Sequence, residues 1–387
     1  MGIKILVRYG EIALKGKNRN LFEQQLQNNM KVAVRNYGAE VIRMHGRLLV
    51  SGPEEHENQL LTHLSRVFGV TSISTVRETK LDMEQIKETA AALAEKHAQG
   101  KKAFSIDTRR SNKHFPLTSP EISRELGSYL QSLYKELVVN LDNPDFTVSV
   151  EIGYDRAFVY MDKTDGPGGL PVGVTGKGLL LLSGGIDSPA AGWLTMKRGL
   201  SIEALHFHSF PFTSRRSQEK VADLCRVLAR YCGGINLHMI QVTEIQKELR
   251  ARCPEGMGVI LLRRMMVRLA EMLSARRKLQ ALVTGENLGQ VASQTLSSID
   301  VISKATEMLI LRPLIGMDKK DIMELAEKID TYDISILPYE DCCTLFVPKN
   351  PVTKPKLNAV TAMEAELDME GLLQEAFSTL ETKTFYR

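Results

Sequence analysis

The sequence predicts an α/β protein, with a mixed α and β amino-terminal part followed by a doubly wound domain built on a parallel sheet. Three observations predict this class. Up to about residue 163, helices and strands follow one another without a long parallel-sheet signal. Residues 164–178 contain six glycines and two prolines, which is typical of a linker. Beyond them, apolar strands alternate with long helices, as in a parallel sheet covered on both faces.

Hydrophobic periodicity predicts each element of the amino-terminal part in turn. Glycines and caps set the boundaries, because one helix ends near Gly38, another ends at Gly100, and Thr118 or Ser119 caps a third ahead of Pro120. The predicted elements are strands at 3–8, within 40–50, at 104–109 and two within 145–162, and helices at about 21–38, 81–100 and 118–137.

In the second part, strands and helices are predicted to alternate. Its predicted strands lie at 179–182, 201–208, 235–242 and 279–284, with helices between them that include 215–232 and 257–277. Ligands of such sheets bind beyond the carboxyl ends of the strands, so a binding site is expected at those ends.

Length and composition exclude several classes. The chain has 387 residues, of which 43% are hydrophobic and 25% charged, which suits two or three folded domains and excludes a disordered or collagen-like chain. The absence of a run of about 18 apolar residues and of a signal peptide predicts a cytoplasmic protein with no membrane association. Five cysteines without a CxxC pair indicate neither a disulfide framework nor a four-cysteine zinc site.

The net charge of +4 is unevenly distributed. Residues 1–50 hold nine basic residues against three acidic ones, whereas residues 301–387 hold ten against fifteen. A basic end on a nearly neutral protein indicates either a polyanionic partner or a solvated basic face, and charge alone does not decide between them.

The most specific motif is Ser-Gly-Gly-Ile-Asp-Ser at 183–188, between a buried strand and a helix with Pro189 in its first turn. Gly184 and Gly185 let backbone N–H groups approach an anion closely, and the helix N-terminus adds about half a positive charge behind them. Strand, loop and helix together predict a phosphate-binding site.

Three side chains of this loop add polar chemistry. The hydroxyls of Ser183 and Ser188 can donate to phosphate oxygens, and Asp187 can hold a Mg²⁺ ion that bridges them. No lysine stands where a Walker A loop needs one, which argues against γ-phosphoryl transfer. The string resembles the SGGxDS loop of the PP-loop ATP pyrophosphatase superfamily, whose members cleave ATP between the α and β phosphates to adenylate a substrate.

Other strand ends give weaker signals. His206 and Phe207 end the second strand, where they could frame adenine or simply pack in the core and rim. Gly285 follows a later strand, in a polar loop. The helix at 257–277 turns three arginines toward a flank, for which a solvated face is the plainest explanation: Arg263, Arg264 and Arg268.

A cationic cluster follows the strand at 104–109. Its members Arg109, Arg110 and Lys113 could bind backbone phosphates, and the neighbouring His114 and Phe115 could stack on exposed bases. Spacing alone leaves RNA binding and a solvated face open. The same string, together with LDNPDFTVSVEI further on, resembles the THUMP domain of RNA-modifying enzymes over roughly residues 58–163.

With the opening KILVRYGEIALKGKNRNLFEQQL, these segments resemble the tRNA 4-thiouridine synthetase (tRNA uracil 4-sulfurtransferase) family over essentially the whole chain. The resemblance implies an N-terminal ferredoxin-like domain at 1–57, a THUMP domain at 58–163, a linker at 164–178 and a PP-loop domain at 179–387. It also implies ATP contacts, which match Leu181, Leu182, His206, Phe207, Arg263, Gly285 and Gln294 and join the loop residues Ser183, Gly184, Gly185, Asp187 and Ser188.

The family's chemistry sets further expectations. O4 of uridine 8 in tRNA is adenylated with ATP and Mg²⁺, the ion being held by Asp187. Sulfur from a persulfidic cysteine, charged by a cysteine desulfurase, then displaces AMP. The family also supplies sulfur to a small carrier protein for the thiamine thiazole. A homodimer is left open.

The resemblance assigns the sulfur-carrying role to Cys343, with Cys342 as the second choice. Glu340 and Asp341 next to this pair oppose thiolate formation, so the local electrostatics are ambivalent. No cysteine follows Cys343, so the rhodanese-like domain of longer members is not expected. The other cysteines are expected to be packed small hydrophobic residues: Cys225, Cys232 and Cys253.

Two other hypotheses stay open. A PP-loop enzyme with this loop could modify another RNA position, which nucleoside analysis would separate from 4-thiouridine synthesis. A non-enzymatic RNA-binding protein with a relic nucleotide pocket predicts no tRNA-dependent release of AMP and pyrophosphate.

Overall fold

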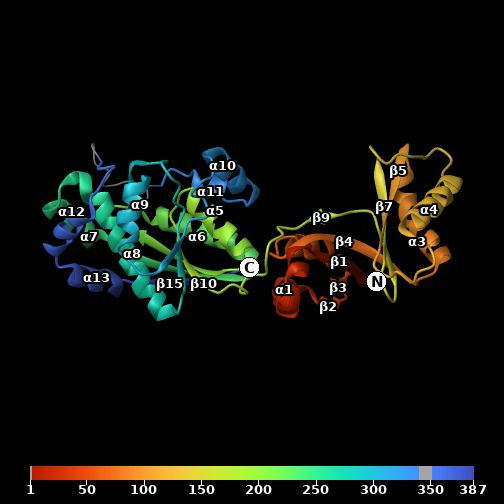
Figure 1. Cartoon of the computed structure of the whole chain (residues 1–387), viewed down its shortest axis with the longest axis horizontal. Coiled ribbons are helices and arrows are strands. Elements are labelled where there is room, and N and C mark those ends of the chain that lie inside the picture. Colours follow the sequence, from red (N-terminus) through yellow and green to blue (C-terminus); the bar gives the residue numbers. More distant parts are fainter. Residues whose placement is uncertain (1, 340–350) are drawn as a thin grey trace. The chain divides into compact units, whose positions relative to one another are not determined.

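The computed structural model describes residues 2–339 and 351–387, and the chain forms two compact units (Figure 1). The amino-terminal unit consists of Met1–Glu23 and Met30–Gly168, and the carboxy-terminal unit consists of Gln24–Asn29 and Gly169–Arg387. Each unit is built on its own sheet, mixed in the first and almost entirely parallel in the second. The predicted fold class is therefore confirmed.

The amino-terminal sheet has the order β2-β3-β1-β4-β8-β7-β5-β6, and β9 also pairs with β4. The long strand β4 joins the two halves, because it pairs with β1 along most of its length and with β8 at its end. The strands are β1 (Gly2–Tyr9), β2 (Glu40–Met44), β3 (Arg47–Pro53), β4 (Val70–Thr79), β5 (Ala103–Arg110), β6 (Val138–Val139), β7 (Phe146–Ile152), β8 (Ala157–Tyr160) and β9 (Thr164–Asp165). The α-helices are α1 (Arg19–Val34), α2 (Glu57–Leu64), α3 (Met83–Ala98) and α4 (Ser119–Leu133).

Helix α4 begins where its predicted cap lies. The Thr118 N–H donates to the Glu121 carboxylate (2.7 Å), and Pro120 occupies the first turn. The buried leucine and isoleucine side chains of α4 belong to one core with α3, β5 and β7. This packing fixes the turn between β5 and α4 that carries the predicted RNA-binding cluster.

The segment 164–178, predicted as a linker, is folded into the units at both ends. Thr164–Asp165 forms β9, and β10 begins before the segment ends. The chain passes from one unit to the other between Gly168 and Gly169. A Cβ at Gly169 would lie 2.2 Å from the Lys197 carbonyl oxygen, and φ is +74° there, so the position requires glycine.

The carboxy-terminal sheet has the order β14-β13-β10-β11-β12-β15, and its strands are parallel except for β15. The strands are β10 (Lys177–Leu181), β11 (Ser201–His208), β12 (Gly234–Gln241), β13 (Ala281–Val283), β14 (Leu309–Leu311) and β15 (Glu381–Tyr386). The α-helices are α5 (Asp187–Lys197), α6 (Arg215–Cys232), α7 (Thr243–Arg252), α8 (Gly258–Arg277), α9 (Leu296–Ser303), α10 (Lys319–Lys328), α11 (Tyr332–Ser335), α12 (Leu357–Ala365) and α13 (Met369–Ser378). Within residues 2–339 and 351–387, no helix is long and apolar enough to cross a membrane.

Helix α8 packs its leucine and methionine side chains in the core of this unit. Arg264, which was expected on a solvated flank, is instead only 2% exposed. Its Nε and Nη2 donate to the two carboxylate oxygens of Glu364 (2.7 and 2.9 Å), and Arg268 donates to both oxygens as well. The solvated-face prediction is therefore wrong for Arg264, whose buried charge is compensated by Glu364.

Candidate active site

The predicted phosphate loop connects β10 to α5 at the carboxyl end of the parallel sheet. Its two serines close the loop. The Ser183 N–H donates to Ser188 Oγ (2.9 Å), and the Ser188 hydroxyl donates to the Ser183 carbonyl (3.2 Å). Ser188 is 4% exposed. Its hydroxyl therefore shapes the loop in this structure, and its donation to a phosphate stays a prediction.

Gly285, just beyond the end of β13, lies directly against this loop. A Cβ at Gly285 would lie 2.7 Å from the Ser188 backbone nitrogen and 2.8 Å from the Asp187 carbonyl carbon, where no side chain fits. Glycine is therefore required by close packing, which brings the loop after β13 against the N-terminus of α5. The predicted ATP contact at Gly285 thus lies beside the phosphate loop.

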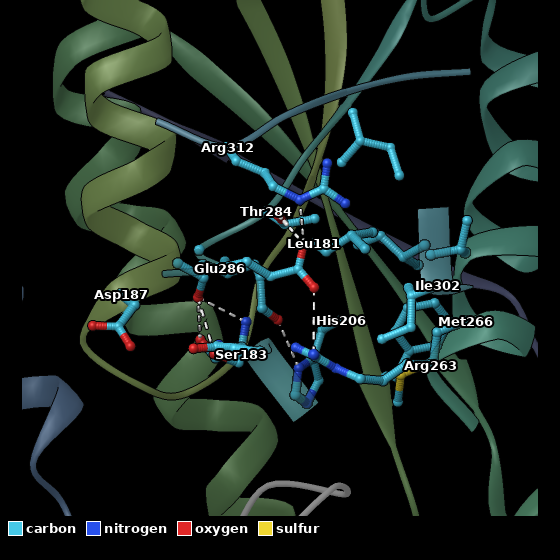
Figure 2. A pocket seen from close by; sticks show the side chains of 18 residues that line it. Leu181, Ser183, Asp187, His206, Arg263, Met266, Thr284, Glu286, Ile302 and Arg312 are labelled. Atoms are coloured by element: carbon cyan, nitrogen blue, oxygen red, sulfur yellow. Dashed lines mark hydrogen bonds and ion pairs between the residues drawn. The ribbon is translucent and has the colours of Figure 1, made fainter. Parts of the chain in front are cut away.

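A pocket of about 280 Å³ opens beside the loop, and Figure 2 shows the side chains that line it. It gathers most of the predicted ATP contacts, namely Leu181, Leu182, Ser183, Asp187, Ser188, His206, Phe207, Arg263, Gly285 and Gln294. Gly184 and Gly185 belong to the loop but not to the lining. Sequence reasoning missed the apolar wall opposite, which includes Met266, Val267, Ile302 and Ile310.

For His206 and Phe207 the sequence left two roles open, framing adenine or packing in the core, and the structure is compatible with both. His206 is 3% exposed, and its Nδ1 lies 3.0 Å from the Leu182 carbonyl oxygen. A carbonyl oxygen only accepts, so this contact places a proton on Nδ1. Phe207 belongs to the core of the unit and also lines the pocket. Both residues are therefore packed and present at the site.

Glu286, which the sequence did not single out, organises the charged wall of the pocket (Figure 2). Its Oε2 accepts from Arg312 Nε (2.7 Å) and Thr284 Oγ1 (3.1 Å), and its Oε1 lies 3.3 Å from Arg263 Nη1. Arg263 Nη1 also donates to the Ser293 carbonyl (3.1 Å). Two guanidinium groups around one carboxylate carry a net positive charge, which favours an anionic ligand.

Asp187 is held by side chains from distant parts of the chain. Its carboxylate accepts from Lys319 Nζ (2.6 Å) and from Gln290 Nε2 (2.9 Å). Lys319 is the first residue of α10, so the fold brings a lysine to the loop from 132 residues away in the sequence. Sequence spacing offers no signal for such a residue.

The described side chains fit Mg²⁺ only together with a ligand. Among residues 2–339 and 351–387, no group of three His, Cys, Asp or Glu side chains could hold a metal ion. An ion at Asp187 would therefore need phosphate oxygens and water for most of its coordination, which is the usual way that Mg²⁺ binds in nucleotide sites.

Gln294 presents an unused acceptor to the pocket. The residue is 8% exposed, and its Oε1 has no hydrogen-bond partner in the described part of the chain. Because buried polar atoms are normally paired, this oxygen is suited to a donor group on a bound ligand.

The predicted RNA-binding cluster is split between two environments. Arg110 Nη1 donates to the carbonyls of Phe115 (3.0 Å) and Leu117 (2.8 Å), so Arg110 closes the turn before α4. The Phe115 ring is 7% exposed and packs in the core, where it cannot stack on a base. Arg109 and Lys113 are exposed. The cations open to a phosphate are therefore Arg109 and Lys113.

The predicted sulfur carriers Cys343 and Cys342 lie outside the described residues. Burial raises the pKa of the Cys225 thiol, raises that of Cys232 to about 11, and raises that of Cys253. A raised pKa disfavours the nucleophilic thiolate, as expected for packed cysteines.

The phosphate loop at the end of a parallel sheet and the adjoining pocket define a nucleotide-binding unit of the PP-loop class. Comparison with known proteins specifies the class further. Residues 173–369 match the family model described as thiamine biosynthesis protein (ThiI). Residues 4–74 match the ThiI ferredoxin-like domain, and residues 80–162 match the THUMP domain. The chain belongs to the ThiI family.

Individual relatives agree over the full length. A probable tRNA sulfurtransferase of Moorella thermoacetica is 50% identical over 385 residues, which cover 99% of this chain and 98% of that protein. Another from Alkaliphilus metalliredigens is 47% identical over 382 residues, covering 98% and 97%. A crystal structure of a 4-thiouridine synthetase–RNA complex with bound ATP has a TM-score of 0.91 at 38% identity and covers 100% of both chains.

Proposed function

We propose that this protein is an ATP-dependent tRNA sulfurtransferase that makes 4-thiouridine. The observation that carries the proposal is the SGGIDS loop, closed by its serines and backed by Gly285, at the mouth of a pocket that presents the Arg263–Glu286–Arg312 cluster. Full-length relatives named tRNA sulfurtransferases and the ATP-bound 4-thiouridine synthetase structure support the same activity.

The pocket suits ATP in both of its halves. The apolar wall offers a surface for adenine, and the unpaired oxygen of Gln294 matches the amino group of that base. The loop backbone and the N-terminus of α5 offer donors and a positive dipole to the phosphates. Arg263 adds a charged donor on the far side of the pocket.

The chemical difficulty is the leaving group. A carbonyl oxygen of uracil leaves poorly, whereas the same oxygen joined to the α-phosphate leaves as AMP. We assign this oxygen to O4 of uridine 8, as in the family. Lys319 and the loop donors would stabilise the negative charge that develops on pyrophosphate. A Mg²⁺ ion held by Asp187 and the phosphates would supply further charge neutralisation.

The sulfur step is assigned to Cys343, with Cys342 as the second thiol. A cysteine desulfurase would charge this thiol as a persulfide, whose terminal sulfur would displace AMP and join Cys343 to the activated carbon through an S–S bond. The Cys342 thiol would then attack the Cys343 sulfur, which releases the thiocarbonyl of the base and leaves a Cys342–Cys343 disulfide that an external thiol reductant must open. Delivery of the same sulfur to a small carrier protein would serve thiamine synthesis. The setting proposed for these reactions is the cytoplasm, and a homodimer remains open.

The proposal is tested by tRNA-dependent pyrophosphate release from ATP, followed by mass spectrometry of the tRNA nucleosides. We expect pyrophosphate and 4-thiouridine, and loss of 4-thiouridine in Cys343→Ala. Retention in Cys343→Ala with loss in Cys342→Ala would move the sulfur-carrying role to Cys342. A thiolated nucleoside at another position would identify a different RNA-modifying enzyme. No tRNA-dependent release at all would favour a non-enzymatic RNA-binding protein.

A further inference from the structure

The loop after β11, residues 209–214, displays aromatic side chains at the carboxyl edge of the sheet. We call it the aromatic loop. Phe210 is 39% exposed and Phe212 is 55% exposed. His206 and Phe207, which line the ATP pocket, lie on the strand that leads directly into this loop. The exposed rings are therefore carried by the same strand end as the nucleotide site.

The aromatic loop is held in place by buried polar groups. The Ser209 N–H donates to Thr213 Oγ1 (3.1 Å), and the Thr213 N–H donates back to the Ser209 carbonyl (3.0 Å). The Phe210 carbonyl accepts from Gln241 Nε2 (2.6 Å) and from Thr243 Oγ1 (3.0 Å). Ser209 is fully buried. These hydrogen bonds hold the backbone of the loop that carries the two exposed rings.

A cation lies beside the Phe210 ring, and others line the groove that this ring borders. The Arg215 guanidinium carbon lies 5.8 Å from the centre of the Phe210 ring, and Arg216 follows it in α6. Phe210 and Arg215 border a groove of about 730 Å³, which Arg226 and Lys383 also line. Two acidic side chains, of Glu219 and Glu381, line it too, so the three cations leave a small positive excess.

Aromatic rings beside guanidinium groups are the surface on which unstacked RNA bases are held. An enzyme that modifies a base must draw that base out of its stack to reach it, which exposes the neighbouring bases too. We propose that the aromatic loop is a stacking platform for unstacked nucleotides of the tRNA substrate, next to the ATP pocket. This inference rests on the proposed function, because it needs a tRNA acceptor at that pocket.

The test uses the full-length protein with tRNA and ATP and no sulfur donor. Pyrophosphate release is measured at saturating ATP for wild type, Phe212→Ala, Phe212→Leu and Phe212→Tyr. We expect Phe212→Ala and Phe212→Leu to lower kcat/KM for tRNA about tenfold, as for loss of one stacked base, and Phe212→Tyr to retain it. The Kd for ATP without tRNA should be unchanged in all three variants, which shows that the pocket is folded. Tyr386→Ala, which removes a 69% exposed ring from β15, is the matched control and should behave as wild type.

Three outcomes would overturn the proposal. Wild-type behaviour of Phe212→Ala would mean that the ring does not bind RNA. Full activity of Phe212→Leu would mean that apolar area, and not stacking, is what matters. Normal pyrophosphate release with a defect only when a desulfurase supplies sulfur would assign the loop to a protein partner. Failure of the wild-type protein to release pyrophosphate would instead reject the proposed function.

Discussion

Arg263 and Arg264 are neighbours in α8, yet one faces the ATP pocket and the other faces the core. Each meets a carboxylate that it shares with a second arginine, Glu286 at the pocket and Glu364 in the core. The Arg264 side chain is 2% exposed and donates through Nε, Nη1 and Nη2. The Arg263 side chain is 23% exposed, and among the described residues its hydrogen bonds involve only Nη1. Arg264 in the core thus directs all three of its side-chain nitrogens to acceptors within the protein, whereas Arg263 at the pocket keeps donors for a ligand.

The largest expected effect comes from opening the core cluster. Glu364→Ala leaves the buried Arg264 charge without its partner and should lower the free energy of unfolding by about 3 to 5 kcal/mol. Denaturant unfolding of the full chain measures the effect. Glu366→Ala, at an exposed position at the end of the same helix, should change it by less than about 0.5 kcal/mol. Equal stabilities of the two variants would contradict the comparison.

Acid should open the same cluster without a substitution. Burial alone would raise the pKa of Glu364, but hydrogen bonds and charge from Arg268 and Arg264 outweigh it and lower the pKa from its usual 4.5 to about 2. Stabilisation by Glu364, roughly 3 kcal/mol at neutral pH, should therefore be lost as the pH falls from about 4.5 to about 2.

The free energy of unfolding of Glu364→Gln, measured across this window, should fall less steeply with acid than that of wild type. Parallel curves would show that Glu364 does not carry this dependence.

The pocket cluster should affect ligand binding instead of stability. Arg263→Gln removes a charged donor worth about 1.5 to 3 kcal/mol, so the Kd for ATP should rise roughly 10- to 100-fold. Titration calorimetry measures it, and the unfolding curve should stay within about 0.5 kcal/mol of wild type. Arg276→Gln, an exposed position on the same helix, is the control. If Arg263→Gln binds ATP with the wild-type Kd but is less stable, Arg263 has a structural role like that of Arg264 and does not bind the ligand.

The smallest effects are expected in the amino-terminal unit, where the same division separates Arg110 from its neighbours. Replacing Arg109 or Lys113 by Gln should weaken tRNA binding and reduce the slope of log Kd against log salt by about one each. Arg110→Gln should instead lower the stability of this unit, because it removes the donor to the Phe115 and Leu117 carbonyls. If the salt slope is unchanged in the Arg109 and Lys113 variants, these two side chains do not contact RNA phosphates and form a solvated surface instead.

The sequence predicted those parts of the site whose residues are consecutive in the chain. The SGGIDS loop was predictable from two glycines, its polar side chains and the following helix, and β10 to β13 from apolar runs. Lys319, Glu286 and Arg312 were not, because only the tertiary fold brings them to the loop and the pocket.

Other misses have equally physical causes. Strand β15 is exposed at nearly every position, so it has no apolar period of two to detect. The burial of Arg264 depends on Glu364, a hundred residues further along, and an arginine on an otherwise apolar helix looks like a solvated one until that partner is placed.

The central claim is that the pocket beside the SGGIDS loop activates tRNA for sulfur transfer. Its most direct test is mass spectrometry of tRNA nucleosides after incubation with ATP, Mg²⁺ and a cysteine desulfurase system, comparing wild type with Asp187→Ala. The account predicts 4-thiouridine with wild type only when ATP is present, and none with Asp187→Ala although that variant still binds tRNA. Equal 4-thiouridine from both proteins, or its formation without ATP, would contradict it.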